Sequence, residues 1–150
     1  MIRRREFALA GLSAAAFAAL GSANERPDPN QDHEAMFDKC AKICSDCQRQ
    51  CDACATYCGK ALMQGGEHHF DAMLTCLDCA DLCSAAASLS ARQGPFADLA
   101  CRACADSCAR CAAQCEKHGR NDAVMSRCAE ECRKCEAACR EMLAHVVSEQ

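Results

Sequence analysis

The sequence predicts an all-α protein, folded as an antiparallel up-down-up-down four-helix bundle with a cysteine-lined core. The 18 cysteines fall into four runs, and within each run they recur at alternating intervals of three and four residues. This spacing keeps one set of side chains on one face of a helix. Gly, Pro and Asn residues punctuate the stretches between the runs, and we find no segment with the period of two that indicates a strand.

The first two helices follow from their start and stop signals. Asp28 can cap a helix that has Pro29 at its first position, so the first helix is predicted from about residue 29 to about residue 63. The sequence Gln64-Gly65-Gly66 ends it, because glycine is common just beyond a helix C-terminus. The second helix is then predicted over about residues 67–92.

The last two helices follow in the same way. Gln93-Gly94-Pro95 precedes the third helix, which is predicted to reach about residue 118 and to stop at Gly119, and Asn121 is the predicted cap of the fourth, which runs to about residue 147. Short connections between long helices make sequence neighbours antiparallel. The connections between helices one and two and between helices three and four then share one end of the bundle, the near pole; the opposite end is the far pole.

The cysteine face of each helix is predicted to be its buried face. Between residues 38 and 60 the large apolar side chains other than cysteine are Ile43 and Tyr57, and most remaining positions are charged or polar. The third and fourth helices repeat this pattern. Because these helices have no second apolar face, the thiols themselves must form the core.

The segment before the bundle reads as an export signal. Arg3-Arg4-Arg5-Glu6-Phe7 precedes an apolar run from Ala8 to Leu20, with small residues after it that suit cleavage. We expect residues 1–23 to be a twin-arginine-type signal peptide, with an ordinary secretory signal as the alternative, residues 24–28 a linker and residues 29–150 the four-helix-bundle domain. The protein is therefore expected outside the cytoplasm, in the periplasm or an equivalent compartment.

The net charge and the hydropathy of the sequence argue against two classes of partner, nucleic acid and the interior of a membrane. The net charge of −4 gives no footprint for nucleic acid. The apolar run near the N-terminus is too short to span a bilayer, so the mature chain is expected to have no membrane span.

A core of thiols has three competing explanations. Reduced cysteines can act as small hydrophobes, but Leu would bury more apolar surface at each position. Disulfides staple many short cysteine-rich exported proteins, yet cysteines three or four residues apart on one helix have near-parallel Cα–Cβ vectors, which suit a disulfide poorly. The third explanation, a store of soft metal ions, uses the sulfur at every position, and we favour it.

Among soft metals the pattern favours Cu(I). One pair of cysteines three or four residues apart supplies the two sulfurs that Cu(I) accepts in a near-linear arrangement. Zinc needs four ligands in a tetrahedron, and an iron–sulfur cluster needs cysteines in loops that wrap it. Bare thiolates in a dry core are costly, and Cu(I) would neutralise them. The predicted content is multiple Cu(I) per chain, up to about one per cysteine.

Two alternatives stay open at this point. One is a metallothionein-like sink for zinc or other soft metals. The other is a thiol redox protein, whose expected signal is a single Cys-x-x-Cys beside an α/β pattern; we find neither that pattern nor a distinctive pair. Storage of copper and detoxification of copper need the same core, so the residues do not separate them.

The chain resembles the bacterial copper storage proteins, and its signal resembles that of their exported branch. The resemblance covers about residues 30–147 and rests on helical cysteine runs on all four predicted helices. It implies a bundle that binds many Cu(I) ions, an absence of catalysis and a homo-oligomer; a copper chaperone or chelator is the expected donor or acceptor. Carried over position by position, the metal ligands are Cys40, Cys44, Cys47, Cys51, Cys54, Cys58, Cys76, Cys79, Cys83, Cys101, Cys104, Cys108, Cys111, Cys115, Cys128, Cys132, Cys135 and Cys139.

The second helix departs from an even distribution of cysteines. Its run ends at Cys83, and the residues that continue the stripe, Ala86, Ala87 and Ser90, cannot bind copper. The far half of the core is therefore expected to rely on the other three helices.

Neutral copper ligands gather at the near pole. When the cysteine stripes are extended to this end, they reach thioether and imidazole side chains, which bind copper more weakly than thiolate does. The resemblance implies an opening of this composition. The predicted sites of copper uptake are Met63, His68, His69, Met73, His118 and Met125. At the far pole, Met36 and Met142 form a lower-ranked candidate for a second opening.

Overall fold

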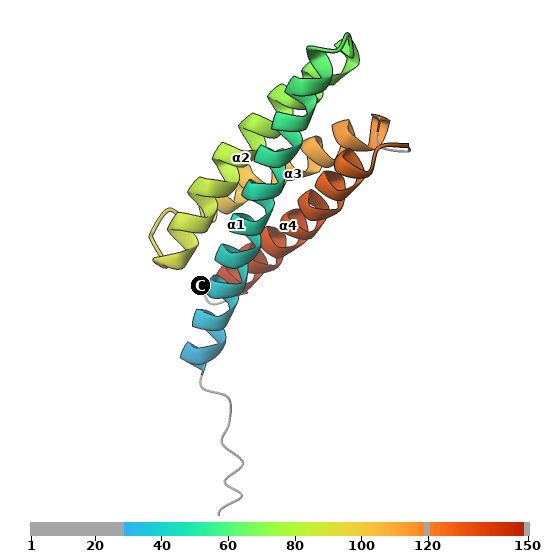
Figure 1. Cartoon of the computed structure of the whole chain (residues 1–150). Helices are drawn as coiled ribbons and strands as arrows, with labels where there is room; N and C mark the ends of the chain where they lie inside the picture. The colour runs from blue at the N-terminus through green and yellow to red at the C-terminus, as the bar shows by residue number, and fades with distance from the viewer. Residues whose placement is uncertain (1–28, 119–120, 149–150) are drawn as a thin grey trace, which may run out of the picture.

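The chain folds as an all-α four-helix bundle, as predicted (Figure 1). The computed structural model describes residues 29–118 and 121–148, so the predicted signal peptide and linker, and Gly119, lie outside the described residues. The helices are α1 (Pro29–Leu62), α2 (Phe70–Ala91), α3 (Ala97–His118) and α4 (Ala123–Ser148), and a 3-10 turn, η1 (Glu67–His69), precedes α2.

The helices pack in the up-down-up-down order. α1 contacts α2 and α4, and α3 contacts the same two helices, so each helix has two neighbours around the bundle. The α1–α2 turn, the end of α3 and the start of α4 lie at the same end in Figure 1, the near pole, and the α2–α3 turn lies at the other end. Every cysteine stripe therefore faces one central axis.

The turn after α1 needs a glycine. Gly65 has a φ of +90°, which disfavours any residue with a Cβ atom, and the amide of Gly66 closes the turn by donating to the carbonyl of Ala61 at 3.0 Å. At the far pole Gln93 adopts a φ of +49° and ends α2 in the left-handed conformation.

Two local predictions were wrong in detail. Residues 67–69 form a 3-10 turn rather than the first turn of α2. The cap of α4 is Asp122, not Asn121, because the Oδ1 atom of Asp122 accepts the backbone N–H groups of Val124 at 2.9 Å and Met125 at 3.1 Å. Asn and Asp are about equally good N-cap residues, so residue type alone does not show which of these two adjacent residues is the cap.

Sulfur fills the core between the two poles. All 18 cysteines are buried, 17 of them with no exposed surface and Cys40 at 1%. Alanines complete the packing, and the described buried side chains larger than cysteine are Phe37, His69, Met125 and Met142. Because these four lie towards the ends of the stripes, the fully buried side chains in the middle of the described bundle are those of cysteine and alanine.

The stretch from Glu67 to Ala91 is long and apolar enough to cross a membrane by length and composition alone. In the structure this stretch is η1 and α2, and α2 packs Cys76, Cys79 and Cys83 into the core. Its remaining apolar character comes partly from exposed Phe70, Leu74 and Leu77.

Candidate metal centre

The cysteines of the near half stack in layers that take one thiol from each helix. Successive cysteines on a helix advance by about 5 Å along its axis, since the average spacing is 3.5 residues. Within each layer the four sulfur atoms lie within 4.8 Å of one another. The layers, from the near pole inwards, are Cys54, Cys76, Cys115 and Cys128; Cys51, Cys79, Cys111 and Cys132; and Cys47, Cys83, Cys108 and Cys135.

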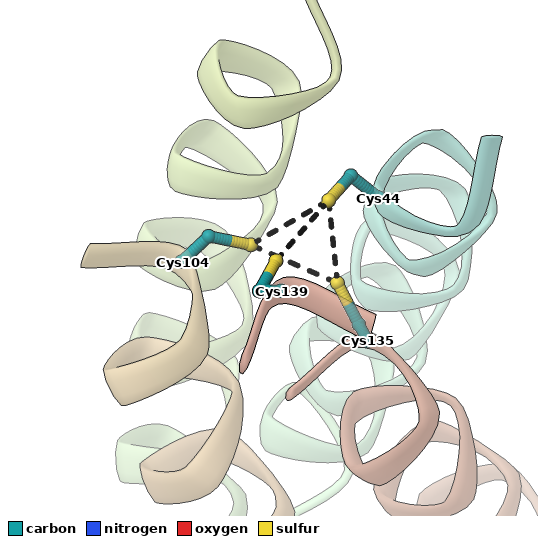
Figure 2. A group of neighbouring side chains, drawn as sticks. All are labelled: Cys44, Cys104, Cys135 and Cys139. Atoms are coloured by element: carbon teal, nitrogen blue, oxygen red, sulfur yellow. Dashed lines mark hydrogen bonds between the residues drawn. The ribbon is translucent and has the colours of Figure 1, made fainter. Parts of the chain in front are cut away.

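The far half draws its thiols from three helices. Figure 2 shows Cys44 of α1, Cys104 of α3, and Cys135 and Cys139 of α4 pointing towards one another. The sulfur of Cys44 lies 3.5 Å from that of Cys139 and 3.7 Å from that of Cys135. The α2 residue that continues the stripe beside them, Ala86, is buried and has no donor atom on its side chain. This placement agrees with the sequence prediction.

The sulfur contacts continue from layer to layer. Along α1, the sulfur of Cys47 lies 4.0 Å from that of Cys51, and the sulfur of Cys40 lies 3.9 Å from that of Cys44. Across helices, Cys44 and Cys135 connect the far group to the near layers. The thiols thus form one connected network along the bundle axis rather than isolated sites.

These separations suit soft metal ions. Metal–thiolate bonds of about 2.3 Å require sulfurs about 3.7 to 4.6 Å apart, depending on whether the sulfurs surround the ion or flank it. The observed groups, all within 4.8 Å, meet that requirement. All 18 cysteines are free thiols in the structure, so each sulfur is available as a ligand.

Burial and neighbouring thiols make the protonated form of several core cysteines the favoured one. Burial raises the pKa of Cys58. Hydrogen bonds with Cys115, Cys128 and Cys76, together with burial, raise the pKa of Cys54. A soft cation must therefore displace protons when it binds here, which couples metal binding to proton release.

The near pole brings together three of the predicted uptake residues as a row of imidazoles. The ring centroids of His68 and His118 are 5.4 Å apart, and those of His68 and His69 are 4.2 Å apart. His68 and His118 are exposed, whereas His69 is buried. The row therefore leads from the surface into the end of the bundle.

Two of the three predicted methionines continue this row inwards, and one does not. Met125 is fully buried one turn before Cys128, and Met73 is half-buried beside Gly59, next to Cys58. Met63 lies just beyond the end of α1 with 89% of its surface exposed. The structure thus places Met63 on the outside of the pole.

Buried His69 has the properties of a neutral soft-metal ligand. Burial lowers its pKa, with a further lowering from His68 and His118. Its Nδ1 atom is buried and has no hydrogen-bond partner among the described residues. Neutral imidazole offers a nitrogen lone pair to copper.

Sequence reasoning missed two residues that shape this pole. The hydroxyl of Tyr57 donates a hydrogen bond to the Oδ2 atom of Asp122 at 2.5 Å, which joins α1 to the cap of α4. The ring of Tyr57 also meets the edge of His69, with centroids 5.7 Å apart. The available signal was that Tyr57 is the one tyrosine of the chain and directly precedes Cys58.

Comparisons with known proteins agree with this geometry. Residues 4–144 match the family described as Copper storage protein. One similar solved structure shows copper loading to a cytosolic copper storage protein from Streptomyces lividans (five coppers), and its sequence is 31% identical to this chain. The TM-score is 0.66, and the match covers 76% of this chain and 97% of that one. Ccsp from the same organism, loaded with 10 copper equivalents, is 31% identical, with a TM-score of 0.64 over 81% of this chain and 94% of that one.

A further solved structure, the Cu(I)-bound copper storage protein BsCsp3, is 31% identical, with a TM-score of 0.63 over 69% of this chain and 94% of that one. No curated protein matches the sequence.

Proposed function

Because this chain belongs to the copper storage protein family, we propose that each of its 18 core cysteines is a Cu(I) ligand and that the filled core approaches one ion per cysteine. The protein binds multiple Cu(I) ions through core thiolates and stores them; it is not an enzyme. The observation that carries the proposal is the connected network of buried sulfurs. A Streptomyces lividans relative is described with 10 copper equivalents.

Charge balance supports a high stoichiometry. Each thiol that loses its proton leaves a negative charge in a buried site, and unpaired buried charge is very costly. One Cu(I) per thiolate leaves the core neutral, with each sulfur shared between two ions. When fewer Cu(I) ions are bound, the thiols without copper keep their protons, and the core stays neutral.

The test is an anaerobic titration with Cu(I) against a competing chelator, with native mass spectrometry to count the ions. We expect saturation at about 18 ions, one per cysteine. Saturation at two or three ions would overturn the proposed stoichiometry.

We propose that copper passes through the near pole. The imidazole row and the thioethers of Met73 and Met125 support this route, because neutral ligands hold Cu(I) less tightly than thiolates do and can transfer it inwards. A copper chaperone or a chelator would deliver or collect the ion at exposed His68 and His118.

Replacing Met63, Met73 and Met125 together by Leu tests this route. We expect slower Cu(I) uptake in stopped-flow measurements with unchanged final capacity. The matched control replaces Met36 and Met142 at the far pole by Leu and should load at the normal rate. Unchanged uptake by the near-pole variant would contradict the route.

We also propose export by the twin-arginine route. Its support is Arg4-Arg5-Glu6-Phe7 followed by an apolar run. Replacing Arg4 and Arg5 by Lys is expected to retain the protein in the cytoplasm, as measured by fractionation. Undiminished export of this variant would point to an ordinary secretory signal.

Self-association is proposed through the outer face of α2. Phe70, Leu74 and Leu77 follow the spacing i, i+4 and i+7 and are all exposed, and a second copy would cover this stripe. The variant Leu74→Glu/Leu77→Glu is expected to shift the sedimentation coefficient to that of the monomer. A monomeric wild-type chain would contradict the proposal.

A further inference from the structure

The far pole carries a pair of imidazoles that lies outside the cysteine core. His33 stands near the start of α1 and His145 in the last turn of α4. These two helix ends lie at the same end of the bundle in Figure 1, and the ring centroids of the two histidines are 5.3 Å apart. Both side chains are half-buried, so solvent reaches them.

Neighbouring side chains hold the two rings in place. The ring of His33 lies against that of Phe37, one turn further along α1, with centroids 4.6 Å apart. Nearer the core, Lys39 and Glu141 form an ion pair of 2.6 Å between the same two helices. A pair of ligands that is already positioned loses less conformational freedom when an ion binds.

The separation of the rings suits one ion that is bonded to both. A metal–nitrogen bond of about 2.1 Å places the ion about 3.2 Å from the centre of each imidazole ring, since the bond points away from the ring. A tetrahedral angle at the ion then separates the two centroids by about 5.2 Å, close to the observed 5.3 Å. Imidazole offers its lone pair from either Nδ1 or Nε2, and rotation of the ring selects which nitrogen faces the ion.

Two buried apolar side chains separate the imidazole pair from the thiols. On α1 the cysteine stripe continues outwards from Cys40 to Phe37, and on α4 it continues from Cys139 to Met142. Phe37 is 5% exposed and Met142 is fully buried. The histidines are the next residues outwards on both stripes, so an ion held between them lies apart from the sulfur network.

We propose that His33 and His145 bind one divalent cation of the class that suits imidazole, Cu(II), Ni(II) or Zn(II), outside the Cu(I) store. Thiolates are the softer ligands and suit the Cu(I) of the core. Each imidazole donates one nitrogen lone pair, water supplies the remaining ligands, and no electron is transferred. The bound ion joins the start of α1 to the end of α4. This inference goes beyond the proposed function, because the site needs neither thiolate nor Cu(I).

Titration of Ni²⁺ into the anaerobic, Cu(I)-filled protein tests the site, since the occupied thiolates no longer compete for the added ion. Two-dimensional ¹H–¹⁵N NMR reports where paramagnetic Ni²⁺ binds, through the broadening of nearby amide signals. We expect broadening at the start of α1 and the end of α4, and its loss in His33→Asn and in His145→Asn. Asn keeps a polar side chain at each position but lacks an imidazole nitrogen.

The matched control is His118→Asn, because His118 and His68 form a similar pair at the near pole. This control should leave the far-pole broadening unchanged. Absence of far-pole broadening in the wild type, or its persistence in both His33→Asn and His145→Asn, would overturn the inference. The Cu(I) capacity of both far-pole variants should equal that of the wild type; a lower capacity would place these histidines in the Cu(I) store and would likewise overturn it.

Discussion

The near and far halves of the core differ in how many helices supply sulfur. In the near half all four helices contribute one thiol to each layer, and His and Met side chains lie at the end of the stripes. In the far half α2 contributes Ala86 and Ser90 instead, and Phe37 and Met142 fill the end of the bundle. One helix, α2, therefore accounts for the difference in sulfur supply, while the cysteine runs of α1, α3 and α4 extend into both halves.

The difference shows that burial and ligation are separable in this fold. Ala86 and Ser90 are as fully buried as any cysteine, so the bundle does not need thiols in order to close. The number of ligands at each level is set by which side chains occupy the inner face, and α2 lowers that number towards the far pole.

Zinc should distinguish the two halves most strongly. Zn²⁺ requires about four thiolates in a tetrahedron, which the three near layers can supply without sharing a cysteine. We expect saturation at about three zinc ions, against about 18 for Cu(I). Competitive titration with both ions, read by native mass spectrometry, measures the ratio. Equal capacities for the two metals would show that the near and far halves do not differ in the number of thiolates they offer to each ion.

Removing four thiols from each half tests their independence. The near variant replaces Cys51, Cys79, Cys111 and Cys132 by Ser, and the far variant replaces Cys40, Cys44, Cys101 and Cys139 by Ser. Each should lose about four ions, one per sulfur removed. The near variant should also load its remaining sites more slowly, because it interrupts the sulfur network between the near pole and the far half.

Stopped-flow loading and far-UV circular dichroism separate slow transfer from loss of fold in these variants. Equal loading rates for two folded variants would show that copper does not travel through the near layers to reach the far half.

The two buried methionines of α4 allow a matched comparison of stability. Met125 and Met142 are both fully buried, one at each pole, and truncation of such a side chain to Ala costs about 2–5 kcal/mol. We expect both variants of the metal-free protein to lose stability in this range in urea unfolding. Copper uptake should slow in Met125→Ala alone. A slowed Met142→Ala would indicate a second opening at the far pole.

The smallest expected effect concerns the cap at the near pole. Asp122→Ala should destabilise the protein by about 1 kcal/mol, a usual cost of losing an N-cap. Burial alone would raise the pKa of Asp122, but hydrogen bonds from Tyr57 and from the amides of Met125 and Val124 lower it. The stabilisation is therefore present above the unfolded carboxyl pKa, about 3.9, and is lost as the pH falls through the lower folded value.

Urea unfolding of wild type and Asp122→Ala at pH 7 and near pH 2 checks this sign. The difference between the two proteins should shrink at the acidic pH. A constant difference would assign the effect to packing rather than to the charge of the carboxylate.

The fold and the buried face were predictable because both follow from residue spacing. Cysteines at three- and four-residue intervals have one possible common face, and polar residues elsewhere leave that face as the core. The shortage of sulfur in the far half was predictable for the same reason, since Ala86 and Ser90 continue the stripe of Cys83.

The burial of individual side chains at the near pole was less predictable, because it depends on the local backbone geometry. The 3-10 turn at residues 67–69 buries His69 and leaves His68 exposed, although the two are neighbours of the same type. α1 ends at Leu62, which leaves Met63 facing solvent. The hydrogen bond between Tyr57 and Asp122 joins residues 65 positions apart, and no local sequence pattern predicts such a contact.

A core of cysteine and alanine has a consequence for how long a molecule survives. These side chains bury little apolar area, and bound copper adds free energy to the folded state alone. The melting temperature should therefore rise with the number of ions held. Since proteases degrade the transiently unfolded chain, an empty molecule should be removed sooner than a full one, so that turnover would adjust the amount of protein to the supply of its cargo.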